Sequence, residues 1–238
     1  IKIFNAICKK NNLLLIEDSA ETIGGEYLNK KAGSFGIGNF SFFPTKNITV
    51  GEGGMITTND KNFSERIRIL INHGMKKSTF ERGEKELPWY KNAVEAGYNY
   101  RMSNLLAGIG VEQIKKIDIM NNKRRDKSKY LTKKLLEIDF IEPPVEIADR
   151  KHVYQTYSVI IKKNVDRNNL VKHLRNCGIG ASVHFDPPIH LQEYYKLNYS
   201  TVKLPVTEFV SSHIMSLPMY PSLAKEDIDY IVSKIKEI

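Results

Sequence analysis

Two side chains near the start of the sequence could together carry out carbonyl chemistry. Lys46 lies in the run of residues 39–47, downstream of a short apolar run, residues 13–16, that Glu17 and Asp18 follow. A lysine amine can form a Schiff base with an aldehyde cofactor, and a carboxylate at the nitrogen of a pyridine ring keeps that ring protonated and electron-withdrawing. The pair therefore indicates carbonyl chemistry on a bound cofactor.

The residues around Lys46 strengthen this interpretation. A lone Asp after a strand is more often a turn or a helix cap, and most lysines are solvated. Here Ser41 precedes Lys46, and the glycine-rich run 51–54 follows it. Small and hydroxyl residues let backbone N–H groups approach an anion, although a glycine turn needs no ligand to exist. We expect the four features to form one site.

Two nucleotide-binding motifs are absent from the sequence. The glycine runs 33–38 and 51–54 both fail the spacing Gly-x-Gly-x-x-Gly, and no segment matches the phosphate loop Gly-x4-Gly-Lys-Ser/Thr. A Rossmann dehydrogenase and a P-loop NTPase are therefore not expected.

Composition indicates a globular chain without a membrane partner. Of 238 residues, 41% are hydrophobic and 26% are charged, and the longest apolar runs have the length of a core strand. Cys8 and Cys177 lie far apart, which fits a reducing cytoplasm better than a disulfide framework. We find no signal peptide and expect a cytoplasmic protein. Because the first residue is Ile1, we also expect the chain to begin inside a longer protein.

The net charge of +9 is concentrated in one segment. Between residues 115 and 137 there are nine Lys or Arg residues and three acidic residues. The segment also carries apolar residues at helical spacing: Ile114, Ile117, Leu131, Leu135 and Ile138. This pattern is typical of a packed helix with a solvated basic face, and no nucleic-acid-binding motif accompanies it. We therefore expect no nucleic-acid partner.

The elements that must position Lys46 and Asp18 alternate along the chain. The patterns predict a helix over residues 3–10, strands over 13–16, 40–43 and 55–58, and a helix that Asn59 and Asp60 cap and that runs to about residue 72. A polar, irregular stretch is expected over residues 76–98, and a helix capped by Ser103 then leads into the basic one. Such alternation favours an α/β sheet that is mixed and mostly parallel, with helices beside it. Ligands of such sheets collect beyond the carboxyl ends of the parallel strands, which is where Asp18 lies.

Pro143 and Pro144 break this pattern and mark a predicted domain boundary, between a large domain over 1–143 and a smaller α+β domain over 144–238. In the second part we expect a strand over 152–161, a helix over 167–176, an extended segment over 181–185, and helices over 204–215 and 224–238.

Several motifs resemble the DegT/DnrJ family of sugar-nucleotide aminotransferases. They occur in the family's order and approximate spacing over essentially the whole chain: residues 16–21, 33–36, 40–47, 51–54, 72–74, 97–102, 152–154, 183–185 and 217–218. The run Ser-Phe-x-Pro-x-Lys-Asn followed by Gly-Glu-Gly-Gly is highly specific. The resemblance implies the fold type I architecture of enzymes that use pyridoxal 5'-phosphate (PLP), and a homodimer whose active site is shared between subunits.

The resemblance also assigns roles to the site residues. Lys46 corresponds to the Schiff-base lysine and Asp18 to the partner of the pyridine nitrogen. Ser41 corresponds to a phosphate ligand, and Asn99 to the residue that reaches the phosphate of the neighbouring subunit's cofactor. Glu21 stands near the ring hydroxyl, where many members carry Gln and others Glu.

The implied reaction moves an amino group from an amino acid, glutamate in most relatives, to a nucleotide-linked keto-deoxysugar, for amino-sugar and surface polysaccharide biosynthesis. His184, His190 and Arg101 are candidate substrate contacts. The two histidines are six residues apart in a loop that contains proline, which does not fit a metal pair on one helix, and we expect no metal site.

Two alternatives remain. A related dehydratase group uses the same cofactor but has His at the lysine position, so Lys46 favours the transferase. The chain could instead be a catalytically silent piece that acts only in folding or assembly, because relatives carry a long preceding region with a Gly-Thr segment that cradles the phosphate. We expect the piece alone to bind the cofactor weakly or not at all. The sequence leaves the sugar, the nucleotide, the ring carbon, the amino donor and the protonation of Glu21 open.

Overall fold

The structure, a computed structural model, describes residues 1–76, 89, 91–162, 165–199 and 202–238. These residues divide into two compact units. The first contains residues 1–118 and 149–151, and the second contains residues 119–148 and 152–238. This division places most of the long basic helix with the second unit, whereas the domain boundary at Pro143 and Pro144 stays a prediction. Each unit is described by itself.

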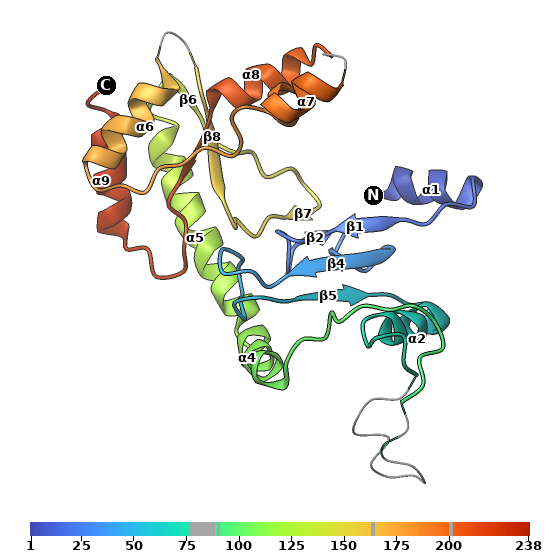
Figure 1. The fold of residues 1–238 in the computed structure, drawn as a ribbon. Coiled ribbons are helices and arrows are strands. Elements are labelled where there is room, and N and C mark those ends of the chain that lie inside the picture. The colour runs from blue at the N-terminus through green and yellow to red at the C-terminus, as the bar shows by residue number, and fades with distance from the viewer. Residues whose placement is uncertain (77–88, 90, 163–164, 200–201) are drawn as a thin grey trace. The chain divides into compact units, whose positions relative to one another are not determined.

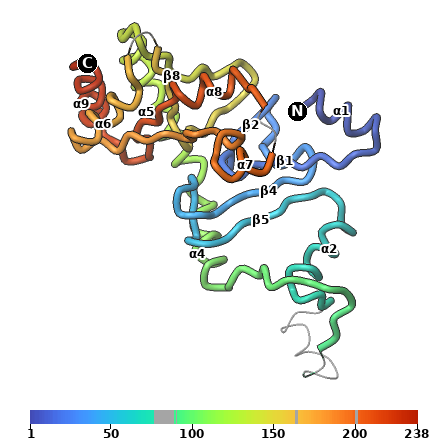
Figure 2. Tube along the Cα trace, turned by 45° about the horizontal axis from the view of Figure 1, so that its top comes forward, coloured from blue at the N-terminus to red at the C-terminus, as the bar shows by residue number. Residues whose placement is uncertain are grey.

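The first unit is built on a mixed three-stranded sheet of β1 (Ile16–Asp18), β4 (Ile37–Ser41) and β5 (Gly54–Thr57). The strand order is β1-β4-β5 (Figures 1 and 2). Strand β1 is parallel to β4, and β5 is antiparallel to it. The predicted first strand covered residues 13–16, but β1 begins where that prediction ends. Glu17 and Asp18 are therefore strand residues rather than residues that follow a strand.

Three helices accompany this sheet: α1 (Lys2–Lys10), α2 (Lys61–Leu70) and α4 (Asn104–Ile114). The two predicted helix caps are confirmed. Asp60 Oδ1 accepts a hydrogen bond from Phe63 N at 3.1 Å, and Ser103 Oγ accepts one from Leu106 N at 3.3 Å. Much of the irregular stretch expected before residue 98 lies outside the described residues.

A second small sheet of the first unit was not predicted. Strands β2 (Glu26–Tyr27), β3 (Lys30–Lys31) and β7 (Arg150–Lys151) pair antiparallel in the order β3-β2-β7. Strands of two residues show no alternation of apolar and polar side chains, so sequence periodicity cannot reveal them. Strand β7 brings a segment that is distant in sequence into the first unit.

The second unit contains an antiparallel sheet of β6 (Ile141–Glu142), β8 (Tyr157–Ile161) and β9 (Ile214–Leu217). Helices α5 (Ile117–Leu135), α6 (Arg167–Asn176) and α9 (Lys225–Ile235) lie together beside this sheet in Figure 1, and their apolar residues share its core. The remaining elements are η1 (Ile189–Leu191), α7 (Glu193–Asn198) and α8 (Pro205–His213). The predicted helix over 167–176 is confirmed.

The basic helix α5 packs as its apolar spacing predicted. Leu131 and Leu135 are fully buried, although Ile114, at the end of α4, is 45% exposed. Arg124 departs from the expected solvated face, because its Nη1 donates to the carbonyl oxygen of Met219 at 2.5 Å and burial lowers its pKa. One of the positive charges of this helix is thus buried and hydrogen-bonded inside the second unit.

One predicted helix boundary is wrong. The helix expected over residues 204–215 ends at His213, and the chain continues as strand β9. Met215 and Leu217 become buried when β9 pairs with β8, so a tertiary pairing outweighs the local helical pattern. Within the described parts of the chain, we find no helix long and apolar enough to cross a membrane.

Candidate active site

The carboxyl ends of β1 and β4 bring the first candidate residues together. In this parallel pair Asp18 stands opposite Asn39, and Ser19 N donates to Asn39 O at 2.9 Å. Asp18 is exposed, and its Oδ1 accepts a hydrogen bond from Ala20 N at 3.2 Å. The predicted placement of Asp18 at the carboxyl end of a parallel strand is confirmed.

Lys46 and Glu21 meet beside this strand end. Lys46 lies in the loop after β4, and Glu21 lies in the turn after β1. Their Nζ and Oε1 atoms are 2.8 Å apart. The Lys46 side chain is only 14% exposed, whereas that of Glu21 is 56% exposed. The structure thus joins the two segments that the sequence singled out through an ion pair that is open to solvent on one side.

Ser41 and the glycine run lie next to this loop. Ser41 ends β4, and its Oγ accepts a hydrogen bond from Phe43 N at 3.3 Å. Opposite it in β5 stands Gly54, where an added Cβ would lie 2.7 Å from the carbonyl oxygen of Phe40. The close approach of the two strands therefore explains one glycine of the run without a ligand.

Glu17 is a residue whose role the sequence did not indicate. It is 7% exposed, between two exposed residues of β1. Its carboxylate accepts hydrogen bonds from Gly33 N at 2.9 Å, Phe35 N at 2.6 Å and Gly36 N at 2.7 Å. Successive side chains of a strand point to opposite faces, so Glu17 and Asp18 lie on different faces of the sheet. This alternation of side chains along the strand was the signal in the sequence that could have predicted different environments for Glu17 and Asp18.

Asn99 and Arg101 form a separate group. Arg101 Nη2 lies 3.5 Å from Asn99 Oδ1 and 3.2 Å from His73 Nε2, and Asn99 forms a β-bridge with Asn72. Among the residues that the structure describes, no hydrogen bond or ion pair joins this group to Lys46. The role of Asn99 toward a neighbouring subunit stays a prediction.

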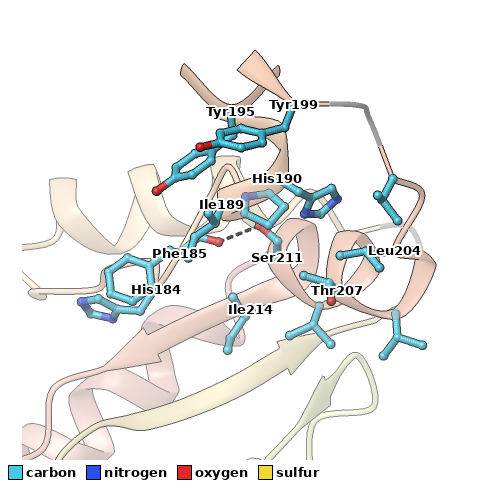
Figure 3. Close-up of a pocket in the computed structure, with 14 residues that line it drawn as sticks. His184, Phe185, Ile189, His190, Tyr195, Tyr199, Leu204, Thr207, Ser211 and Ile214 are labelled. Atoms are coloured by element: carbon cyan, nitrogen blue, oxygen red, sulfur yellow. Dashed lines mark hydrogen bonds between the residues drawn. The ribbon is translucent and has the colours of Figure 1, made fainter. Parts of the chain in front are cut away.

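His184 and His190 line a pocket of about 710 Å³ in the second unit. His184 Nδ1 lies 3.1 Å from Ser216 Oγ, and His190 Nε2 lies 3.2 Å from Glu208 Oε1. Figure 3 shows His190 between two tyrosines on one side and Thr207 on the other. Most of the wall is apolar or aromatic, including Phe185, Ile189, Tyr195, Tyr199, Leu204 and Ile214.

A buried arginine holds the loop that carries these histidines. The Arg167 side chain is 3% exposed, and its guanidinium donates to the carbonyl oxygens of Ile214 at 2.8 Å and Ser211 at 3.2 Å. It also contacts Asp186 Oδ2 at 2.5 Å, and Ser211 Oγ donates to Phe185 O at 2.6 Å. In the sequence Arg167 reads only as the first residue of a helix.

The groups at the ends of β1 and β4 fit the cofactor that the motifs imply. Lys46 offers an amine for an aldehyde carbon, Asp18 a carboxylate for a pyridine nitrogen, and Ser41 a hydroxyl for a phosphate. All three come from adjacent parallel strands or the loop that follows one of them. The chemistry of these groups therefore matches PLP.

Comparisons with known proteins agree with this match. The sequence model of the DegT/DnrJ/EryC1/StrS aminotransferase family matches residues 1–236. The spore coat polysaccharide biosynthesis protein SpsC of Bacillus subtilis is 31% identical over 240 residues, which cover 98% of this chain and 61% of that protein.

Solved structures are similar over the same extent. Helicobacter pylori PseC, an aminotransferase involved in the biosynthesis of pseudoaminic acid, is 26% identical with a TM-score of 0.88, over 98% of this chain and 61% of that one. S. venezuelae DesV, in complex with a ketimine intermediate, is 26% identical with a TM-score of 0.86, over 98% and 60%.

The similarity confirms the expected α/β aminotransferase fold. The chain spans 61% of the length of SpsC and a similar share of the two solved structures. With a family match over nearly every residue, the chain belongs to the DegT/DnrJ/EryC1/StrS aminotransferase family.

Proposed function

We propose that the protein is a PLP-dependent aminotransferase that moves an amino group from an amino acid to a nucleotide-linked keto-deoxysugar. The observation that carries the proposal is the Lys46–Glu21 contact of 2.8 Å beside the strand that ends in Asp18. A lysine amine and an aspartate carboxylate at the carboxyl ends of neighbouring parallel strands are the Schiff-base group and the ring-nitrogen partner that this chemistry uses. Family membership supports the same activity.

When bound, PLP supplies a ring that accepts the electrons of the substrate C–H bond. Asp18 holds a proton on the ring nitrogen through its negative charge. The Ser41 hydroxyl would bind the phosphate. Lys46 Nζ would hold the cofactor as a Schiff base, would be freed when the substrate amine takes its place, and would then move the proton at the reacting carbon, with Glu21 orienting that amine.

The proposed substrates follow from two relatives. We propose glutamate as the amino donor and a sugar for a surface polysaccharide as the acceptor, because SpsC is a spore coat polysaccharide biosynthesis protein and PseC acts in the biosynthesis of pseudoaminic acid. His184, His190 and Arg101 are the proposed substrate contacts. The proposed assembly is a cytoplasmic homodimer in which Asn99 reaches the cofactor of the other subunit.

The sugar dehydratase remains the alternative activity. It removes a hydroxyl group rather than adding an amine, and its relatives carry His where this chain has Lys46. Incubation with glutamate and a set of keto-sugar nucleotides distinguishes the two, because the transferase leaves a sugar with a new amine and the dehydratase leaves a sugar that has lost a hydroxyl group. The same assay tests whether the protein is catalytically silent, because neither product then forms.

An absorbance spectrum of the protein at its natural length, with PLP added, tests the role of Lys46 directly. We expect a visible band from the lysine-linked cofactor, and we expect Lys46→Ala to remove it. Lys61→Ala is the matched control, since Lys61 is 88% exposed on α2. A mutant band equal to that of the natural protein would exclude Lys46 from the mechanism.

A further inference from the structure

We propose that Glu17 is a positioning residue for the cofactor site. Its carboxylate fixes the segment that leads into β4 against β1, and this alignment sets the places of Asp18, Ser41 and Lys46 relative to one another. The inference rests on the proposed function, because it concerns the same site.

Glu17 is directed away from the proposed cofactor. It is 7% exposed, and the strand residues on either side of it, Ile16 and Asp18, are exposed. Since neighbouring side chains in a strand point to opposite faces, a ligand that meets Asp18 does not meet Glu17. An effect of Glu17 on the cofactor must therefore act through the backbone.

The contacts of Glu17 use both of its oxygens. Oε1 accepts from Phe35 N at 2.6 Å and Gly36 N at 2.7 Å, and Oε2 accepts from Gly33 N at 2.9 Å. Backbone N–H groups that converge in this way form an anion-binding concavity, and hydrogen bonds to a charged acceptor are stronger than those to a neutral one. A glutamine at this position would turn an N–H₂ group toward one of these donors.

The segment 33–36 is shaped for this close approach. Gly33 has a φ of +78°, and an added Cβ would lie 2.4 Å from the ring of Phe40. At Gly36 an added Cβ would lie 2.3 Å from the carbonyl oxygen of Leu15. The segment therefore fits against β1 in one position, with little room to shift.

Strand β4 begins directly after this segment. Ile37 N donates to Leu15 O at 2.8 Å, and the register then places Glu17 opposite Gly38 and Asp18 opposite Asn39. Ser41 ends the same strand, and Lys46 follows in its loop. A shift of β4 along β1 would therefore separate the carboxylate of one strand from the hydroxyl and amine that the other supplies.

Glu17→Gln, made in the protein at its natural length, tests this inference. Hydrogen exchange at the amides of residues 33, 35 and 36 measures the contact itself, and titration with PLP measures its effect on the site. We expect exchange at these amides to become at least about 10-fold faster and the dissociation constant of PLP to rise at least about 10-fold, because charged hydrogen bonds are lost.

Two controls separate positioning from a general loss of stability. Glu65→Gln removes a charge from exposed α2 of the same unit, and we expect no change in either measurement. Ile117→Ala removes buried apolar contact from that unit, and we expect it to lower stability but to change PLP binding by less than about 3-fold. If Glu17→Gln does not fold, Glu17→Asp keeps the charge on a shorter side chain and should show smaller changes in the same direction.

Equal PLP affinity in Glu17→Gln and the natural protein would overturn the inference, and so would an equal loss of affinity in Ile117→Ala. If the natural protein does not bind PLP, the proposed function fails and the cofactor role of Glu17 fails with it. The exchange measurement then still decides whether Glu17 holds the segment 33–36.

Discussion

The two candidate regions of the molecule are held together in different ways. At the end of β1 and β4, backbone pairing and backbone amides set the geometry, and Asp18 is left exposed with one hydrogen bond from Ala20 N. In the pocket of the second unit, side chains set it, since Arg167 and Ser211 hold the loop that carries the histidines. In the first region the group proposed for chemistry therefore does not hold the fold. In the second region the side chains beneath the pocket also hold the loop that carries its histidines.

This difference predicts what a substitution in each region changes. A change to an exposed functional group at a strand end should alter activity and leave folding intact. A change to the buried groups under the pocket should lower stability, because a buried polar atom that loses its partner keeps the full cost of desolvation.

The largest effect is expected at Asp18. Asp18→Asn removes the negative charge but keeps an oxygen that can accept from Ala20 N, so turnover should fall by about 10²–10³-fold. The free energy of unfolding should change by less than about 0.5 kcal/mol, since the residue is exposed. Steady-state transamination and urea unfolding measure the two effects. A large loss of stability would contradict the contrast between the regions.

A large effect on stability is expected at Arg167. Arg167→Leu leaves the carbonyl oxygens of Ile214 and Ser211 without their donor and Asp186 without its cation. Because the Asp186 side chain is 39% exposed and can be solvated, we expect a loss of roughly 2–4 kcal/mol in urea unfolding rather than more. Lys172→Ala, exposed on the same helix, should stay within about 0.5 kcal/mol.

A smaller effect is expected at Ser211. Ser211→Ala removes one hydrogen bond to Phe185 O and should lower the free energy of unfolding by about 1 kcal/mol. The neighbouring exposed residue offers the control, because the partners that the structure shows for Ser212 Oγ lie in its own helix α8: it donates to the carbonyl oxygens of Glu208 and Phe209 and lies 2.8 Å from His213 Nδ1. If Ser211→Ala and Ser212→Ala cost the same, the buried serine does not support the loop.

The smallest effect concerns pH and His152. Burial lowers the pKa of His152, nearby Glu146 raises it and Arg125 lowers it, with a net result below the ordinary 6.5. The folded state therefore binds this proton less readily than the unfolded state, so stability present above pH 6.5 is lost as pH falls below that value. Protonation would also cost the hydrogen bond that His152 Nδ1 accepts from Tyr154 N.

Although its ring is partly desolvated, His152 as a whole residue is exposed to water that screens its charge, so this loss should stay below about 1 kcal/mol. Urea unfolding at two pH values, one above 6.5 and one below, measures it. His152→Asn keeps an acceptor and removes the titrating group, so its stability should fall less with pH than that of the natural protein. Equal pH dependence in both proteins would exclude His152 as the source.

Local signals in the sequence predicted much of the fold. The caps Asp60 and Ser103 and the helix over 167–176 depend on neighbouring residues, and the structure confirms them. Strand β9 was missed because its pairing with β8 is a contact between distant segments. The short strands of the second sheet carry no periodic pattern at all.

The candidate site shows the same limit. The rule for parallel strand ends placed Asp18, and the motif spacing singled out Lys46, but neither could show that Glu21 lies 2.8 Å from the amine. The roles of Glu17 and Arg167 depend on which backbone groups fold against them. Residue type indicates which interactions a side chain can make, and only the fold shows which partners it contacts.

Strand β7 has a consequence for how the protein folds during synthesis. It completes the sheet of β2 and β3 in the first unit, yet the ribosome produces it only after residues 119–148 of the second. The segments before and after β7 are joined to each other, because His152 N donates to Glu146 Oε1 at 2.8 Å. The first unit thus cannot finish folding during synthesis until part of the second has emerged, so a chain stalled before residue 149 should expose the unpaired edge of β2 to chaperones and proteases.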